Sequence, residues 1–154
     1  MASSLFVINE WLPEDLIGAN GWERQAESFK FLEILRDKPD RIAVLEGSPW
    51  MGKAYRLMRH QDRIIRMLSK YLHQSILVDS NKCLRLNQGE LKSLPDEMKA
   101  RSPSEDLYLV EVYYTAGASA LITTDQKLLN ALTTTGIHVE SRDDFLKDYL
   151  LISN

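Results

Sequence analysis

The sequence lacks the features that mark secreted and membrane proteins. It contains a single cysteine, Cys83, which has no partner within the chain and suits the reducing cytoplasm. Its longest apolar runs, such as residues 5–8 and 149–152, have only four residues, too few to span a bilayer. The N-terminal Met-Ala-Ser-Ser is neither basic nor followed by a long apolar segment, so no signal peptide is expected. We therefore expect a cytoplasmic protein without membrane association.

The chain also has few histidines and a small net charge. The three histidines, His60, His73 and His138, lack the spacing of zinc ligands relative to one another or to Cys83. The chain has 19 Lys and Arg against 22 Asp and Glu, and the net charge of −3 gives no overall reason to expect nucleic acid. With 154 residues, of which 44% are hydrophobic, the chain suits one domain, residues 1–154, with a core that needs no disulfide or structural metal.

Short apolar runs alternate with helical patterns along the chain. Strands are expected at residues 5–8, 42–45, 76–78, 120–123 and 137–139. Helices are expected at residues 22–35, 49–72 with a break, 107–116 after the polar residues 104–106, 126–132 and 141–150. Residues 81–103 predict little beyond one short helix. Strands that alternate with helices pair in parallel, which predicts an α/β three-layer sandwich with a central, mostly parallel sheet flanked by helices.

Polar side chains follow several of the expected strands. Ligands of open parallel sheets bind beyond the carboxyl ends of the strands, so residues at these positions are candidates for a site. They are Asn9, Glu10, Glu46, Asp79, Thr123, Thr124 and Asp125, with Glu105 and Asp106 opening the helix that leads into the fourth strand. Converging carboxylates would suit Mg²⁺ or Mn²⁺, which favour oxygen ligands. The alternative is that Asp106 and Asp125 only cap helices.

Two adjacent stretches near the C-terminus carry a more specific pattern. Residues 104–118 read Ser-Glu-Asp-Leu-Tyr-Leu-Val-Glu-Val-Tyr-Tyr-Thr-Ala-Gly-Ala, and residues 120–129 read Ala-Leu-Ile-Thr-Thr-Asp-Gln-Lys-Leu-Leu. An Asp that begins a helix, a Gly-Ala turn and a strand that ends in Thr-x-Asp resemble the C-terminal half of a PIN domain. Residues 5–9 are similar to that family's first strand, and the resemblance extends to about residue 150.

PIN domains are metal-dependent ribonucleases whose carboxylates hold one or two divalent ions. The resemblance implies that Asp106 and Asp125 are the matching acids, with the hydroxyl of Thr123 or Thr124 beside the second. The family's first acid corresponds to Asn9, an amide that can still coordinate a metal but carries no charge. The implied metal ligands are therefore Asp106, Asp125 and Asn9, and Thr124 completes the implied catalytic set.

The family's helical Glu falls at about residues 52–55, where this sequence has no acid. Whether Glu10 or Glu46 compensates stays open at this point. The resemblance thus implies a ribonuclease that hydrolyses RNA with Mg²⁺ or Mn²⁺ at a weakened site. The alternative is a catalytically inactive copy of the fold that binds RNA or a protein.

A basic stripe lies between residues 49 and 74, which hold six basic residues against one acid, Asp62. The six are Lys53, Arg56, Arg59, Arg63, Arg66 and Lys70. On one continuous helix they would share a face, opposite a buried face formed by Leu57, Met58, Ile64, Ile65, Leu68 and Leu72. A stripe of one sign predicts contact with an RNA backbone. A solvated helix surface, an acidic protein partner such as an antitoxin, and a homo-oligomer are the alternatives.

The first turn of this segment also resembles a phosphate-binding loop. Residues 47–54, Gly-Ser-Pro-Trp-Met-Gly-Lys-Ala, match the G-x-x-x-x-G-K pattern but have Ala54 where Ser or Thr should bind Mg²⁺. Pro49 and Trp50 are bulky where backbone amides should surround the phosphates. Ser48 as a helix cap with Pro49 at the first helical position explains the same letters. Nucleotide binding is therefore the third alternative.

Overall fold

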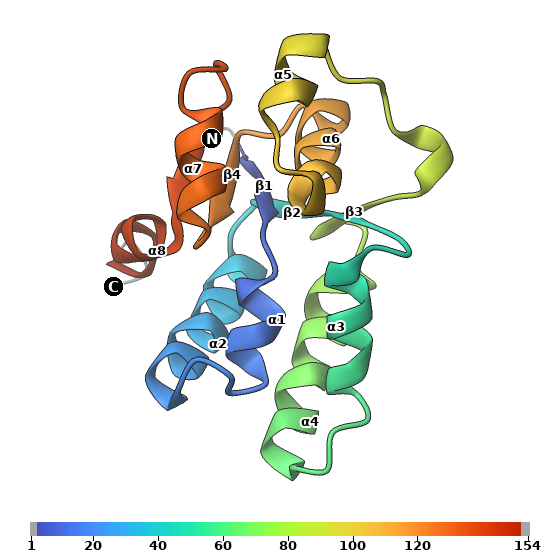
Figure 1. Ribbon diagram of the computed structural model, residues 1–154. Helices are drawn as coiled ribbons and strands as arrows, with labels where there is room; N and C mark the ends of the chain where they lie inside the picture. The colour runs from blue at the N-terminus through green and yellow to red at the C-terminus, as the bar shows by residue number, and fades with distance from the viewer. Residues whose placement is uncertain (1–2, 152–154) are drawn as a thin grey trace.

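The computed structural model describes residues 3–151, which form one sheet with helices on both faces (Figure 1). All strand pairs are parallel, in the order β3-β2-β1-β4-β5. The strands are β1 (Leu5–Ile8), β2 (Arg41–Leu45), β3 (Cys83–Leu86), β4 (Ala120–Thr123) and β5 (Val139–Ser141). The predicted α/β three-layer sandwich is confirmed.

Eight α-helices flank this sheet within residues 3–151. They are α1 (Trp11–Leu16), α2 (Trp22–Asp37), α3 (Pro49–Leu57), α4 (Arg63–Tyr71), α5 (Asp96–Arg101), α6 (Leu107–Ala116), α7 (Gln126–Leu132) and α8 (Arg142–Leu151). A π-helical turn, Leu72–Leu77, extends α4, and 3-10 turns occur at Gln88–Glu90 and Ser104–Asp106. None of the helices in this part of the chain combines the length and apolarity that crossing a membrane requires.

The two faces of the sheet carry separate hydrophobic clusters. Along β1, Phe6 and Ile8 pack with α1, α2, α3 and α8, whereas Leu5 and Val7 pack with α6 and α7. This division follows from the period of two in a strand, which turns successive side chains to opposite faces. Both faces are covered, so the central strand β1 is a continuous apolar run, and its neighbour β2 is apolar from residue 42 to residue 45.

The third strand differs from the prediction. Residues 76–78 were expected to form it, but Ile76 and Leu77 belong to the π-helical turn. Both are buried in the same hydrophobic cluster as Phe6 and Ile8. A run of three apolar residues does not distinguish a strand from a buried helix, and Ile76 continues the four-residue spacing from Leu72. The strand is Cys83–Leu86, and Asp79 consequently lies in the turn before a strand instead of after one.

The remaining differences are local. The last strand is Val139–Ser141 and shares only Val139 with the predicted range, because residues 139–141 are the ones in register with β4. The helix α1, directly after β1, was not predicted. The break expected in the 49–72 helix spans residues 58–62, and Asp62 caps α4 through bonds from the amides of Ile64 and Ile65 at 2.7 and 3.3 Å.

Candidate metal centre

Asp106 is the central residue of the candidate site. It ends the 3-10 turn before α6, and only 5% of its surface is exposed. Its Oδ2 atom is buried and has no hydrogen-bond partner within residues 3–151. Buried polar atoms in folded proteins are almost always paired, and a buried carboxylate oxygen without a donor is costly. Asp106 is therefore held in a position that a cation would satisfy.

Two further carboxylates lie beside Asp106. Glu105, Asp106 and Asp125 each offer one oxygen, and these three oxygens lie within 4.8 Å of one another. Asp125 caps α7, and its Oδ1 accepts bonds from the amides of Lys127 and Leu128 at 2.9 and 3.4 Å. The cap fixes the Asp125 carboxylate at the end of β4, where it faces the start of α6. The structure thus brings together Asp106 and Asp125, as the sequence pattern anticipates, and adds Glu105.

The electrostatics of this group follow from burial and like charge. Burial and the adjacent Asp125 carboxylate raise the pKa of Asp106 to about 7, and the charges of Glu105 and Glu10 act in the same direction. Carboxylates that repel one another in a partly dry setting bind a divalent cation favourably, because the cation offsets their mutual repulsion. Oxygen ligands of this kind suit Mg²⁺ and Mn²⁺.

Asn9 and Thr123 support this group from β1 and β4. The Nδ2 of Asn9, a buried residue, donates to Thr123 Oγ1 at 2.7 Å, and Thr123 Oγ1 accepts the amide of Asp125 at 2.9 Å. The Oδ1 of Asn9 accepts the amide of Glu10 at 2.6 Å. Asn9 therefore acts on Asp125 through Thr123. Of the two threonines that the resemblance allows, Thr123 makes this link, whereas Thr124 is exposed.

Glu46 and Asp79 lie outside this carboxylate group. Glu46 pairs with Arg85 of β3, and Asp79 accepts the amide of Asn81 in its turn. The group of acids whose oxygens converge contains neither residue. Glu46 does not replace the missing helical acid, because Arg85 already neutralises it.

Glu10 lies at the edge of the site and is bound on both sides. Its Oε1 is 2.7 Å from Lys53 Nζ, and its Oε2 accepts the hydroxyl of Tyr108 at 2.8 Å. Lys53 also contacts Glu14 Oε2 at 2.6 Å. Partial burial opposes the charge of Lys53, but the hydrogen bonds and charges of Glu10 and Glu14 outweigh it and raise the lysine pKa. Lys53, expected to contact RNA, is thus bound to acids beside the candidate site. We call Glu10, Glu14 and the three converging carboxylates of Glu105, Asp106 and Asp125 the acidic edge.

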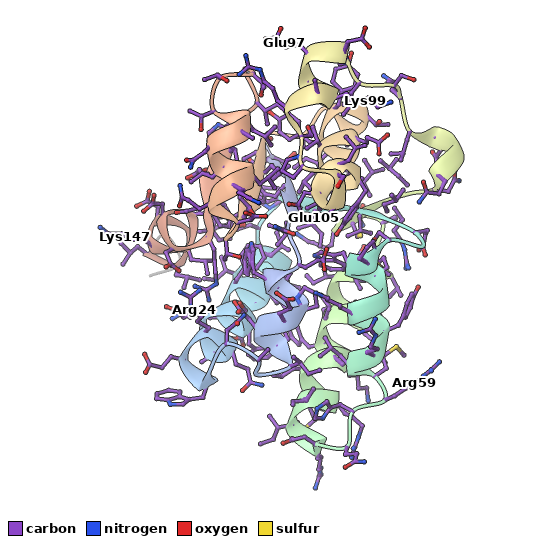
Figure 2. The ribbon with its side chains drawn as sticks, viewed as in Figure 1. Arg24, Arg59, Glu97, Lys99, Glu105 and Lys147 are labelled. Carbon is purple, nitrogen blue, oxygen red and sulfur yellow. The ribbon has the colours of Figure 1, made fainter. Side chains whose placement is uncertain are left out.

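The other five residues of the basic stripe lie on a helical arm formed by α3, residues 58–62 and α4. Arg56 is on α3, Arg59 is in the connection, and Arg63, Arg66 and Lys70 are on α4; all five are exposed. Figure 2 shows Arg59 on the arm, far from Glu105 near the middle of the molecule. The stripe is therefore bent at residues 58–62 instead of following one helix.

The apolar face of this arm is only partly buried. Leu57, Ile65 and Leu72 join the core, as expected, and Leu68 packs against it. Met58 and Ile64 were expected to be buried but are 53% and 63% exposed, and Met67 is 62% exposed. Because the chain reverses at residues 58–62, only one side of each short helix reaches the core. Apolar and basic side chains therefore share the outer surface of the arm.

Most of the segment that resembles a phosphate-binding loop is helical in the structure. Pro49 to Leu57 are α-helical, and Ser48 caps this helix through a bond from the amide of Met51 at 3.2 Å. Trp50 is buried and donates its indole N–H to the carbonyl of Asn9 at 3.1 Å. This geometry favours the helix-start interpretation of these residues.

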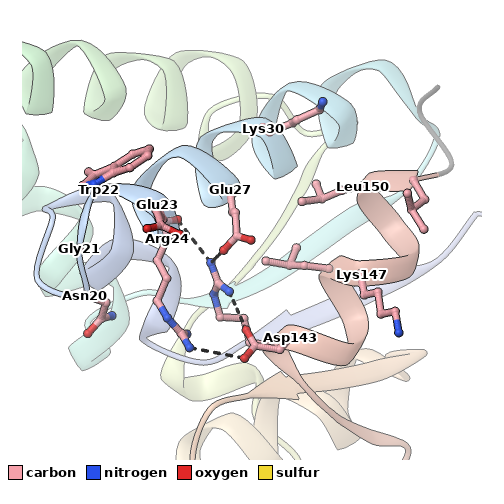
Figure 3. A pocket seen from close by; sticks show the side chains of 13 residues that line it. Asn20, Gly21, Trp22, Glu23, Arg24, Glu27, Lys30, Asp143, Lys147 and Leu150 are labelled. Atoms are coloured by element: carbon pink, nitrogen blue, oxygen red, sulfur yellow. Dashed lines mark hydrogen bonds and ion pairs between the residues drawn. The ribbon is translucent and has the colours of Figure 1, made fainter.

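A larger hollow, of about 750 Å³, lies between the start of α2 and α8 (Figure 3). The buried Arg142 is one of its lining residues and bonds Asp15 at 2.8 Å, Asp143 at 2.8 Å and Glu27 at 3.1 Å. Arg24 also pairs with Asp143 at 3.4 Å. Both arginines are therefore already paired with acids, whereas Asp106 Oδ2 has no partner within residues 3–151.

No family model, curated protein or solved structure matches this chain. The chemistry of the candidate site therefore rests on its own residues and their geometry.

Proposed function

We propose that this protein is a PIN-type ribonuclease that hydrolyses RNA phosphodiester bonds with Mg²⁺ or Mn²⁺ held by Asp106 and Asp125. The observation that carries the proposal is the surroundings of Asp106, whose Oδ2 is buried without a hydrogen-bond partner within residues 3–151 and which offers a carboxylate oxygen within 4.8 Å of oxygens from Asp125 and Glu105. The proposal joins this convergence to the PIN-like pattern of the sequence, in which the same two aspartates begin a helix and follow a Thr-ending strand.

The residues present fit a hard divalent cation. Asp106 supplies a desolvated carboxylate oxygen, and Asp125 supplies a second carboxylate that its helix cap holds in place. Asn9 and Thr123 orient Asp125, so the second ligand does not need to be ordered upon binding. When bound, the ion would polarise the phosphate and lower the pKa of a water molecule. Glu105, which is exposed, is placed to contact the ion or its water from the solvent side.

The helical arm supports RNA as the substrate. Its five exposed basic residues would neutralise backbone phosphates, and Arg66 is already oriented by bonds to the carbonyls of His60 and Gln61 at 2.8 and 2.7 Å. On single-stranded nucleic acid each phosphate contact adds about 0.7 to the salt slope of binding. The acidic edge and the basic arm then have different tasks, which are cleavage and binding.

The test compares two aspartates that both cap helices. Asp125→Asn keeps a capping side chain but removes a metal ligand, and it should abolish Mn²⁺-dependent cleavage of a fluorogenic RNA while the protein stays folded. Asp62→Asn, the matched control, makes the same change at the cap of α4 and should retain Mn²⁺-dependent cleavage; because Asp62 lies among the basic residues of the arm, any change should be confined to KM. Equal cleavage by the Asp125→Asn variant and the wild type would refute the proposed site.

The second candidate function is a binding module without catalysis. The observation that favours it is the uncharged Asn9, whose Oδ1 already accepts the Glu10 amide, at the position of a family acid. The exposed Met58, Ile64 and Met67 among the arginines of the arm suit an RNA or an acidic protein as the partner. This candidate predicts RNA binding that is unaffected by chelators and no Mn²⁺ binding at millimolar metal. Calorimetric titration with Mn²⁺ separates the two functions.

A further inference from the structure

We infer that the ammonium group of Lys53 is a built-in cation of the acidic edge and that it restricts this edge to one divalent ion. The inference rests on the proposed metal site at Asp106 and Asp125. It concerns the neighbouring carboxylates, Glu10 and Glu14, and gives Lys53 a task different from RNA binding.

The geometry around Lys53 is that of an occupied cation site. Oxygens of Glu10 and Glu14 lie 2.7 and 2.6 Å from Nζ, so two carboxylates from consecutive turns of the β1–α1 segment converge on a single point. The side chain of Lys53 is 30% exposed and that of Glu10 is 20% exposed, so water screens their charges incompletely. Without a cation at this point the two glutamates would repel each other.

This cluster adjoins the proposed metal site. The second oxygen of Glu10 accepts the hydroxyl of Tyr108, which lies on α6 two residues after Asp106. The charge of Glu10 also acts on the Asp106 carboxyl. Five carboxylates, those of Glu10, Glu14, Glu105, Asp106 and Asp125, thus belong to this edge, and Lys53 binds Glu10 and Glu14, the two outside the group of converging oxygens.

Lys53 differs in this respect from the rest of the basic stripe. Among its six residues, Lys53 is the one with ion pairs to carboxylates, as far as residues 3–151 show. A divalent ion placed between Glu10 and Glu14 would have to displace the ammonium or lie against it, and like charges at contact distance exclude that arrangement. Replacing Lys53 by a small neutral residue leaves the same two oxygens available to a metal.

The experiment counts Mn²⁺ ions bound per chain by calorimetry and by electron paramagnetic resonance, which detects coupling between neighbouring ions. We expect one ion in the wild type and two in Lys53→Ala. Lys53→Arg keeps the positive charge and should bind one. Lys70→Ala, the matched control, makes the same change in net charge on the exposed arm and should also bind one. The double variant Glu10→Gln/Lys53→Ala lacks one of the two negative charges and should return to one ion.

Each result supports or contradicts a specific claim. One ion in both the wild type and Lys53→Ala, or two in the wild type, overturns the inference while the proposed site at Asp106 and Asp125 stands. A wild type that binds no Mn²⁺ overturns the proposed function and the inference with it. If Lys53→Ala does not fold alone, recovery of its circular dichroism with millimolar Mn²⁺ supports the inference, and an unfolded protein in Mn²⁺ contradicts it.

Discussion

Replacing Asp106 by asparagine should stabilise the metal-free protein at pH 8. The carboxylate is buried, its Oδ2 has no donor, and its pKa is raised from 3.8 to about 7. A raised carboxyl pKa means that the folded state holds its proton longer than the unfolded state. Stability is therefore lost as the pH rises from about 4 to 7, which is the opposite of the effect of a salt-bridged carboxylate. Asparagine keeps the shape of the side chain and never ionises.

The magnitude follows from the size of this shift. With a pKa of about 7 in the folded state and 3.8 in the unfolded state, ionised Asp106 costs about 4 kcal/mol above pH 7. The asparagine amide is itself buried, and an unsatisfied amide costs roughly 1–3 kcal/mol at every pH. We therefore expect Asp106→Asn to increase the free energy of unfolding by about 1–3 kcal/mol at pH 8 and to decrease it by a similar amount at pH 4.

Urea unfolding in the presence of a chelator, at both pH values, measures this effect. Asp144→Asn, at an exposed position on α8, is the control for loss of a carboxylate and should change little at either pH. Adding Mn²⁺ should stabilise the wild type much more than Asp106→Asn, because the variant lacks one of the negative charges that hold the ion. A variant that is less stable than the wild type by the same amount at both pH values would contradict a raised pKa of Asp106. In that case the Asp106 carboxylate would be an ordinary structural group.

Two other substitutions test the surroundings of the site. Thr123→Val removes the hydroxyl that joins Asn9 to Asp125. It should lower the free energy of unfolding by about 1–3 kcal/mol in a thermal or urea experiment and also weaken Mn²⁺ binding. Unchanged Mn²⁺ affinity would show that this link does not orient Asp125. Arg142→Met should lower the free energy of unfolding by about 3–5 kcal/mol, because it leaves the fully buried Asp15 without its cationic partner at 2.8 Å. The Mn²⁺ stoichiometry should not change, and a loss below 1 kcal/mol would mean that this ion pair does not stabilise the packing of α8 on α1.

The sequence predicts those parts of the fold that depend on local pattern. The apolar runs of β1, β2 and β4 are bounded by turn residues, and α7 begins at a capping Asp. Gly117 has φ of 64° and ends α6, as its position after an apolar helix indicates. The proximity of Asp106 and Asp125 follows from the rule that functional side chains gather at the carboxyl edge of a parallel sheet.

Other parts depend on contacts between distant segments. The strand β3 is short and contains the charged Arg85, so its sequence alone resembles a loop. It forms a strand because it pairs with β2 and because Glu46 neutralises Arg85. Residues 76–77 are apolar because they are buried in a helical turn, and the same apolar pair is also typical of a strand. Lys53 has the spacing of the basic stripe, and only the approach of α3 to α1 brings it to Glu10 and Glu14. The spacing of residues in the sequence does not predict this contact between α3 and α1.

The most direct test of the central claim is an anomalous difference map from crystals soaked in Mn²⁺. We predict a single peak in contact with carboxylate oxygens of Asp106 and Asp125, with Glu105 facing it and Lys53 still bound to Glu10 and Glu14. A map without a peak at Asp106, in crystals whose Asp106 carboxylate is accessible to the soak, would contradict the metal centre on which the proposed ribonuclease activity depends.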